Sequence, residues 1–185
     1  MRYVRVMTIA LVVAVALGVL VGSNPVQAAT AAELDRDAKR VLGKLYAKVP
    51  AAKALGEKAK GVLVFPGIVK GGFIVGGQYG EGALIKDGKT VAYYETVSGS
   101  YGLQIGAQKY GYAMFFMTDA ALGYLNKSDG WELGTAPNIV VWDEGMSGGF
   151  STTTLQSDTY AFFFGQQGLM AGLGLQGTKI NRIRK

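Results

Sequence analysis

The sequence has no cysteine and no histidine among its 185 residues. Without cysteine the chain forms no disulfide and carries no lipid on a cysteine, so its stability has to come from packing. Without histidine it has no Ser-His or Cys-His nucleophile, no histidine zinc site and no histidine pH switch. These absences exclude the most common hydrolytic and zinc-dependent mechanisms before any motif is considered.

The first 28 residues have the layout of a secretory signal peptide. Arg2 and Arg5 form a basic start, Val6–Val21 is almost entirely apolar, and Val26-Gln27-Ala28 is a small-x-small cleavage site. The apolar run is shorter than the roughly 20 residues that a membrane-spanning helix needs. We therefore expect cleavage after Ala28 and export to the periplasm or beyond. An uncleaved membrane anchor is the alternative.

The net charge of +6 is distributed unevenly along the chain. Residues 29–70 hold nine lysines and arginines against four acidic residues, whereas residues 71–178 hold four against nine. The tail Lys179–Lys185 adds four more basic residues. Basic ends around an acidic middle form one basic patch if the two ends meet in space. Nucleic acid is not an expected partner, because the chain is exported and has no recognition motif.

The segment after the signal peptide predicts a long amphipathic helix. Thr30-Ala31-Ala32-Glu33 reads as a capping box, and Pro50 ends the helix. A second short helix is expected near Ala51–Lys58. The apolar residues that fall on one face of the long helix are Leu34, Ala38, Val41, Leu42, Leu45 and Val49.

Basic residues recur every four positions beside this apolar face, at Arg36, Arg40, Lys44 and Lys48. Helices that lie on membrane surfaces have this pattern, with the apolar side in the headgroup boundary and cations on lipid phosphates. A solvated helix packed on its own sheet has the same pattern, since its basic residues also suit the negative helix C-terminus. The residues alone leave both interpretations open.

From Gly61 onward the chain is rich in strands and glycine. A Gly-apolar-x-apolar-Gly pattern stands at Gly72–Gly76, Gly102–Gly106 and, in a variant form, Gly168–Gly172. Glycine inside a strand usually marks a bulge, a bend or a close backbone approach, so the sheet is expected to be strongly curved. The predicted strands are Val62–Phe65, Gly72–Tyr79, Gly82–Lys86, Thr90–Ser98, Leu103–Lys109, Tyr112–Met117, Asn138–Trp142, Thr159–Phe164 and Leu169–Ile183.

Together these elements predict an α+β fold: a strongly curved antiparallel β-sheet or partly closed barrel, with an N-terminal amphipathic helix and one short internal helix. The turn Asp87-Gly88-Lys89 joins two strands of a hairpin, and Thr118-Asp119 begins the internal helix. We divide the chain into a signal peptide (1–28), a helical segment (29–58) and a β-rich part (59–185). The last two form one compact domain.

Three motifs look like sites for chemistry. Gly172–Gly177 spells Gly-x-Gly-x-x-Gly, but no helix follows it to bind a dinucleotide. Gly88-Lys89-Thr90 lacks the upstream glycine of a phosphate loop and is explained by the hairpin turn. Asp143-Glu144 and Asp119 are candidate carboxylates for a hydrolase, although no activating partner accompanies them. No cofactor or metal is expected.

The run Phe162-Phe163-Phe164 cannot place all three rings on one face of a strand. It indicates either a core on both faces of the sheet or an aromatic patch that meets lipid. The residues favour the two-sided core.

Several motifs in the β-rich part resemble the SYLF domain, a lipid-binding family of bacteria and of eukaryotic endocytic proteins. The resemblance covers roughly Leu55–Ile183, and Met170 replaces a phenylalanine of the family's Gly-Leu-Phe-Ala-Gly ending. The motifs that carry it are Ala59-Lys60-Gly61, Lys70-Gly71-Gly72-Phe73, Gly76, Gly80-Glu81-Gly82, Gly106, Thr118-Asp119, Leu133-Gly134 and Gly168-Leu169-Met170-Ala171-Gly172 with its continuation to Gly177.

The resemblance implies a non-enzymatic module that binds membrane lipid, in the family through a basic amphipathic N-terminal helix. By position that helix is Glu33–Val49. Export separates this chain from actin and phosphoinositides, the ligands of eukaryotic members, so anionic phospholipids at a membrane surface are the expected partner. The expected lipid-binding residues are Arg40, Lys44, Lys48, Lys60, Lys70, Lys179 and Arg182.

This hypothesis requires the cations of the two chain ends to gather on one side of the sheet. The alternative is an envelope scaffold whose sheet binds another protein, without direct lipid binding. The oligomeric state is left open by the sequence.

Overall fold

The computed structural model describes residues 29–72, 75–101, 106–126, 131–133, 139–143, 157–168 and 178–185. The helices are α2 (Ala31–Lys48), α3 (Pro50–Gly56), α4 (Asp119–Gly123) and the 3-10 helix η2 (Tyr124–Asn126). The strands are β1 (Gly61–Gly72), β2 (Val75–Lys86), β3 (Lys89–Tyr101), β4 (Gly106–Phe116), β5 (Trp131–Leu133), β6 (Ile139–Asp143), β7 (Thr159–Gly168) and β8 (Thr178–Ile183). These elements confirm the predicted α+β class.

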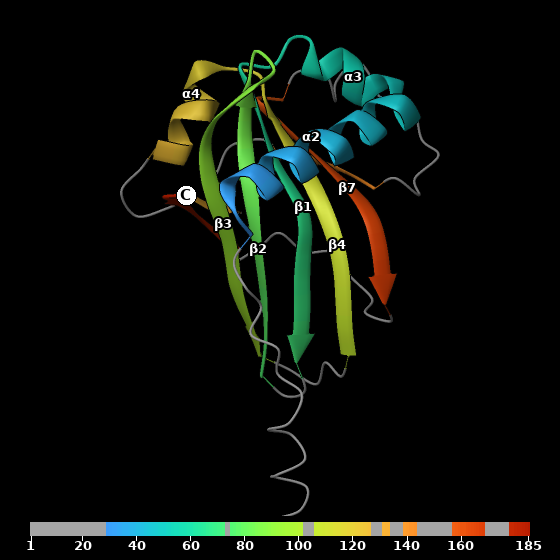
Figure 1. Ribbon diagram of the computed structural model, residues 1–185, viewed down its shortest axis with the longest axis vertical. Coiled ribbons are helices and arrows are strands. Elements are labelled where there is room, and N and C mark those ends of the chain that lie inside the picture. The colour runs from blue at the N-terminus through green and yellow to red at the C-terminus, as the bar shows by residue number, and fades with distance from the viewer. Residues whose placement is uncertain are drawn as a thin grey trace, which may run out of the picture.

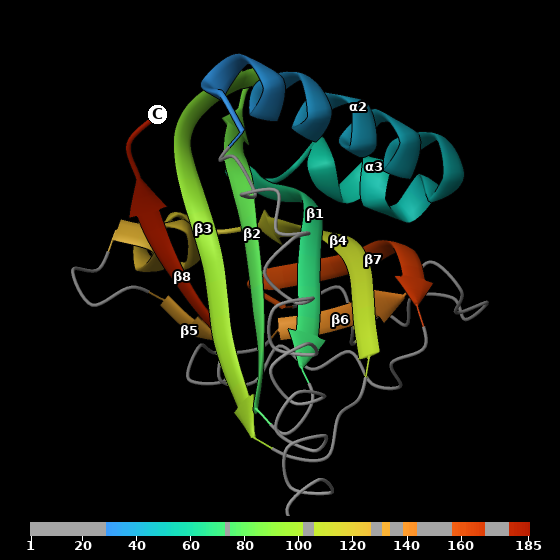
Figure 2. The ribbon, with the colours of Figure 1, turned by 60° about the horizontal axis from the view of Figure 1, so that its bottom comes forward.

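One curved sheet holds all eight of these strands, in the order β5-β8-β3-β2-β1-β4-β7-β6. It curls away from α2 and α3, which lie across its convex face near one end of the long strands (Figures 1 and 2). We call this convex face the outer face and the opposite one the inner face. Within the described strands β5 and β6 are free edges, so the sheet is open and the predicted alternative of a partly closed barrel is wrong.

The prediction of an all-antiparallel sheet fails at one strand. Six strands from β8 to β7 pair antiparallel, and β5 joins β8 in the same way. In contrast, β6 runs parallel to β7, with Ile139 opposite Thr159. A parallel pair needs a long crossover connection, and residues 144–158 are long enough to supply it.

β1 is much longer than the predicted Val62–Phe65 strand, because it continues through Pro66 instead of ending there. Its register shifts at this point against both neighbours, between Val64 and Gly67 toward β2 and between Phe65 and Ile68 toward β4. Proline has no N–H to donate, so a bulge is where a central strand tolerates it.

α2 is packed on the sheet. Leu42 and Leu45, on its apolar face, are only 7% and 3% exposed. They belong to an outer-face core with Val62, Val64 and other residues of β1, β4 and β7. Of the two interpretations that the sequence left open, the helix packed on its own sheet is therefore the correct one, and the apolar face of α2 is not available for insertion into a lipid interface.

The Phe162-Phe163-Phe164 run forms the predicted two-sided core. Phe162 and Phe164 pack on the outer face beneath the helices, and Phe163 packs on the inner face. On the inner side the ring of Phe163 lies 5.5 Å from that of Tyr112, centroid to centroid. All three rings are buried, so they form no aromatic patch for lipid.

The predicted turn and internal helix are confirmed. Asp87 and Gly88 have φ of 50° and 74°, the left-handed conformation that a two-residue hairpin turn requires, and they join β2 to β3. The Thr118 side chain accepts a hydrogen bond from the Ala121 N–H and begins α4. Gly172–Gly177 lies outside the described residues, as does Glu144.

The capping box at the start of α2 is expected to contribute measurably to the stability of the fold. The Thr30 N–H donates to the Glu33 carboxylate (2.9 Å), and the Glu33 N–H donates to the Thr30 hydroxyl (3.3 Å). We expect Thr30→Ala to lower the free energy of unfolding by about 1 kcal/mol at neutral pH, measured by urea denaturation.

The same contacts make the cap sensitive to pH. The hydrogen bonds from the backbone and side chain of Thr30 lower the pKa of Glu33 from its ordinary 4.5. A lowered folded-state pKa stabilises the fold above pH 4.5 and loses this effect as the pH falls through the folded value. The stability difference between wild type and Glu33→Gln should therefore shrink from pH 7 to pH 3, and a constant difference would contradict this assignment.

Candidate functional site

A hollow lined by basic side chains lies between the second half of α2 and the outer face of the sheet. Arg40, Lys44 and Lys48 line it from α2, and Lys109 lines it from β4. No aspartate or glutamate is among the described residues that line it. Its volume is about 350 Å³. We call it the basic hollow.

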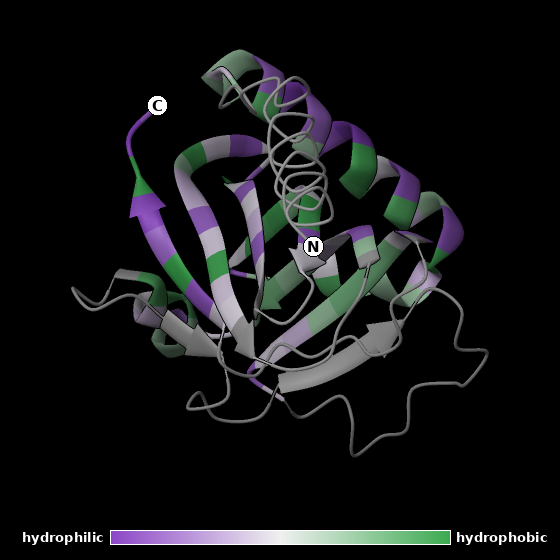
Figure 3. Ribbon diagram, turned by 90° about the horizontal axis from the view of Figure 1, so that it is seen from below, coloured by the Kyte–Doolittle hydropathy of each residue, from purple (hydrophilic) through white to green (hydrophobic). Residues whose placement is uncertain are grey.

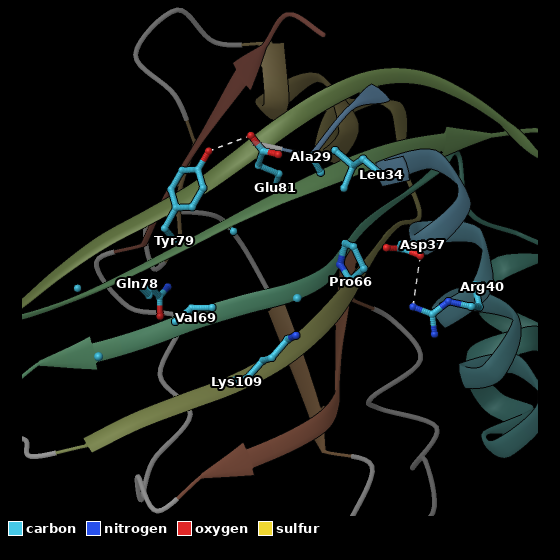
Figure 4. Close-up of a pocket in the computed structure, with 14 residues that line it drawn as sticks. Ala29, Leu34, Asp37, Arg40, Pro66, Val69, Gln78, Tyr79, Glu81 and Lys109 are labelled. Carbon is cyan, nitrogen blue, oxygen red and sulfur yellow. Dashed lines mark hydrogen bonds and ion pairs between the residues drawn. The ribbon is translucent and has the colours of Figure 1, made fainter. Parts of the chain in front are cut away.

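The helix period and the sheet register bring these four cations together. Arg40, Lys44 and Lys48 stand four residues apart and so follow one side of α2. Lys109 lies opposite Val69 in the β1–β4 register, on the outer face. Its side chain extends from β4 toward Pro66 at the bulge (Figure 4), and a Cβ placed on Gly67 would lie 3.4 Å from its Cε.

The cations differ in their partners. Arg40 lies 3.4 Å from the Asp37 carboxylate, which also contacts Arg36. Among the described residues neither Lys44 nor Lys109 forms an ion pair or a side-chain hydrogen bond. Cations held near each other without acidic partners attract anions, and phosphate above all.

A second, larger hollow adjoins the first toward the start of α2. Its volume is about 740 Å³, and Arg40, Pro66 and Lys109 line both hollows. Leu34, Val69 and Tyr79 contribute apolar surface (Figure 4). We call it the apolar hollow, and the two together the groove.

Val69 and Tyr79 are unusual because they are large apolar side chains left in solvent, 56% and 41% exposed. They lie opposite each other on β1 and β2 and line the apolar hollow together with Leu34 of α2 (Figure 4). The Tyr79 hydroxyl donates to Glu81 (3.0 Å), and the partial burial of the side chain together with this carboxylate raises the pKa of Tyr79 to about 12. The ring is therefore neutral at physiological pH.

The two ends of the described chain meet beside the apolar hollow. The Lys185 ammonium donates to the Ala29 carbonyl (2.7 Å) and to both oxygens of Glu81 (2.8 Å). The contact fixes the start of α2 against β2. Because Lys185 is paired with Glu81, its charge is neutralised within the fold.

The two chain ends lie close together, but this does not bring all seven predicted basic residues into one patch. Lys179 and Arg182 lie on β8, on the far side of the molecule from the second half of α2 (Figures 2 and 3). Lys179 shares the outer-face row of Lys109 but is separated from it by β1, β2 and β3. The requirement that both chain ends build one basic patch is therefore not met.

The remaining two predicted cations also lie elsewhere. Lys60 is exposed and precedes β1, where its N–H donates to the Phe116 carbonyl. Lys70 lies near the other end of β1, between Gln78 and Gln108 in the register. Both glutamines are buried, and strand alternation places Lys70 with Ile68 on the inner face. Of the seven predicted residues, only Arg40, Lys44 and Lys48 line the groove.

Sequence reasoning missed Lys109, Val69 and Tyr79. Tyr79 and Lys109 end two of the predicted strands, but alternation does not show which face carries the helices. Val69 lies in the part of β1 beyond Pro66, which was not predicted as a strand. The bulge at Pro66 also exchanges the faces of the residues that follow it. A signal was present in the isolated Lys109, one of the few basic residues in the acidic middle of the chain.

The described residues contain no cluster of three or more side chains suited to a metal ion. They also contain no helix of the length and apolarity needed to cross a bilayer. Asp119 is the first residue of α4, and Asp143 is the last of β6. The groove is therefore the site on which we base a function.

The chain is an α+β domain whose groove is cationic at one end and apolar at the other. Residues 97–184 match the Ysc84 family, described as Las17-binding protein actin regulator. This match covers slightly less than half of the chain, and it confirms the resemblance to the SYLF domain. The family is linked to lipid and protein binding in general. A search of the curated proteins finds no matching sequence.

Proposed function

We propose that this protein is exported and binds anionic phospholipid surfaces without catalysing a reaction. The observation that carries the proposal is the convergence of Arg40, Lys44, Lys48 and Lys109 on one hollow without an acidic residue in its described lining. Each cation near an anionic surface contributes about 1 kcal/mol. Four of them give attraction enough for reversible peripheral binding.

The binding mode in this proposal differs from the one that the sequence suggested. Because the apolar face of α2 is buried on the sheet, the helix presents its basic edge and keeps its leucines in the core. The exposed apolar groups nearest these cations are Val69 and Tyr79 on the strands. In our proposal the lipid phosphates contact the basic hollow, and these two side chains face the interface.

The family description names Las17 binding and actin regulation. We do not extend either to this chain, because the layout of residues 1–28 predicts export. The protein recovered from the envelope should then begin at Ala29. Anionic phospholipid headgroups attract basic residues at a membrane surface, so they are the anions we propose for this site.

Vesicle co-sedimentation tests the proposal directly. The purified protein should pellet with phosphatidylglycerol vesicles and stay in solution with phosphatidylcholine vesicles. Retention should fall as salt rises from about 0.05 M to about 1 M, because the screening length shrinks from more than 10 Å to about 3 Å. Equal retention on both lipids at every salt concentration would contradict the electrostatic mechanism.

The scaffold alternative is favoured by the same exposed Val69 and Tyr79, since exposed apolar groups also mark protein interfaces. It predicts a protein partner from the envelope that is lost when Val69 is changed, while neither vesicle type retains the protein.

A further inference from the structure

The groove changes character along its length. Its cationic end is formed by Arg40, Lys44 and Lys109, and its apolar end by Leu34, Val69 and Tyr79. The two ends are continuous, since they share Arg40, Pro66 and Lys109 in their lining. A phosphate headgroup alone would occupy only the cationic end. The apolar end therefore fits a ligand that also carries an apolar chain.

The carboxylates of the apolar hollow do not oppose an anionic ligand. Asp37 is paired with Arg36 and Arg40, and Glu81 accepts hydrogen bonds from Lys185 and Tyr79. Lys44 and Lys109, by contrast, have no ion-pair partner in the described part of the chain. The charge that remains to be neutralised in the groove is therefore positive.

One residue that lines the apolar hollow is a glycine, which has no side chain to fill the space. Gly77 lines it beside Tyr79, and a Cβ placed on Gly77 would meet only the Ser98 carbonyl, at 3.4 Å. The packing of the sheet thus leaves room for a side chain there. Glycine weakens a strand, so its presence in an open, exposed position fits a surface that another molecule approaches closely.

We infer that the groove binds one amphiphile, with its phosphate against Arg40, Lys44 and Lys109 and a single acyl chain along Leu34, Val69 and Tyr79. The volume of the apolar hollow, about 740 Å³, is in the range of small-molecule sites. The inference rests on the proposed function and goes beyond it, because attraction to a surface needs no acyl-chain site. The protein would hold one lipid partly out of its bilayer.

Isothermal titration calorimetry of the purified protein with monododecyl phosphate, below its micelle concentration, tests whether the groove holds an acyl chain. We expect one dodecyl phosphate to bind per protein molecule, at least about a hundredfold more tightly than inorganic phosphate. The gain comes from the methylene groups of the dodecyl chain, which are transferred from water into the groove. Dodecyltrimethylammonium, with the same chain and a positive head, should bind far more weakly. Equal affinities for dodecyl phosphate and inorganic phosphate would overturn the inference.

Two exposed valines give a matched pair of variants. Val69 lies in the groove at 56% exposure, and Val91 lies on β3 outside the groove at 50%. Val69→Asp should weaken dodecyl phosphate about tenfold or more, because a carboxylate would line the path of the chain. Val91→Asp should leave the affinity unchanged. If both substitutions lowered the affinity for dodecyl phosphate equally, the acyl chain would not lie along Val69, and the inference would be contradicted.

The two proposals fail in different ways. Retention on anionic vesicles with no preference for dodecyl phosphate over inorganic phosphate leaves surface binding intact and overturns the groove inference. Tight dodecyl phosphate binding without vesicle retention overturns surface binding and supports the groove. If Val69→Asp lowers the unfolding midpoint, the ligand comparison on the unaltered protein still decides the matter.

Discussion

Replacing Lys44 and Lys109 together with glutamate is expected to lower the affinity for anionic vesicles about a hundredfold at low salt. Each lysine removed costs about 1 kcal/mol of attraction, and each glutamate introduced adds repulsion from the same phosphates. Both side chains are exposed and without ion-pair partners among the described residues. The fold should therefore remain stable, and the loss should show in vesicle titrations.

The control is the same double charge reversal at Lys179 and Arg182. These residues are also exposed, but they lie on β8 across the sheet from the groove. The net charge changes by the same amount in both double variants, so a non-specific charge effect would weaken both equally. We expect the β8 variant to keep most of its binding, and equal losses would show that the groove has no special role.

Gly82→Ala is expected to lower the free energy of unfolding by about 3 kcal/mol. A Cβ on Gly82 would lie 2.7 Å from Cδ1 of Phe65 and 2.8 Å from the Val64 carbonyl oxygen. The ring cannot move aside freely, because it packs against Tyr112 at a centroid distance of 4.8 Å. Overpacking of this kind typically costs 1–3 kcal/mol, and a contact with backbone places it at the upper end.

Gly99→Ala is the matched control, since Gly99 is an exposed strand glycine with nothing within 4 Å of its added Cβ. Its stability should stay within about 0.5 kcal/mol of wild type. Urea denaturation followed by circular dichroism measures both variants. An alanine at position 82 that is tolerated as well as one at 99 would show that Phe65 does not lie over Gly82.

Local patterns predicted the helices and turns well. The capping box set the start of α2, Pro50 separated α2 from α3, and Asp87-Gly88 formed the turn between β2 and β3. Contacts within four residues determine these features, so they can be recognised before the fold is known. The two-sided burial of Phe162–Phe164 followed equally from strand geometry.

Long-range pairing decided most of the candidate site. β1 continues through Pro66, β6 joins β7 in parallel, and Lys109 aligns with Val69 through the β1–β4 register. Such pairings join residues far apart in sequence, and no local pattern specifies them. For that reason Lys70 and Lys109, both in glycine-rich strands, were not distinguished in advance as inner and outer residues.

The sequence by itself determined that the chain has no histidine or cysteine chemistry, that α2 has one apolar and one basic side, and that the fold is α+β. Only the tertiary structure decided that the apolar side of α2 is used by the protein's own core and that its basic side faces Lys109 across a groove. The physical reason is that an amphipathic pattern fixes which residues share a side of a helix. What that side contacts depends on the sheet that folds against it.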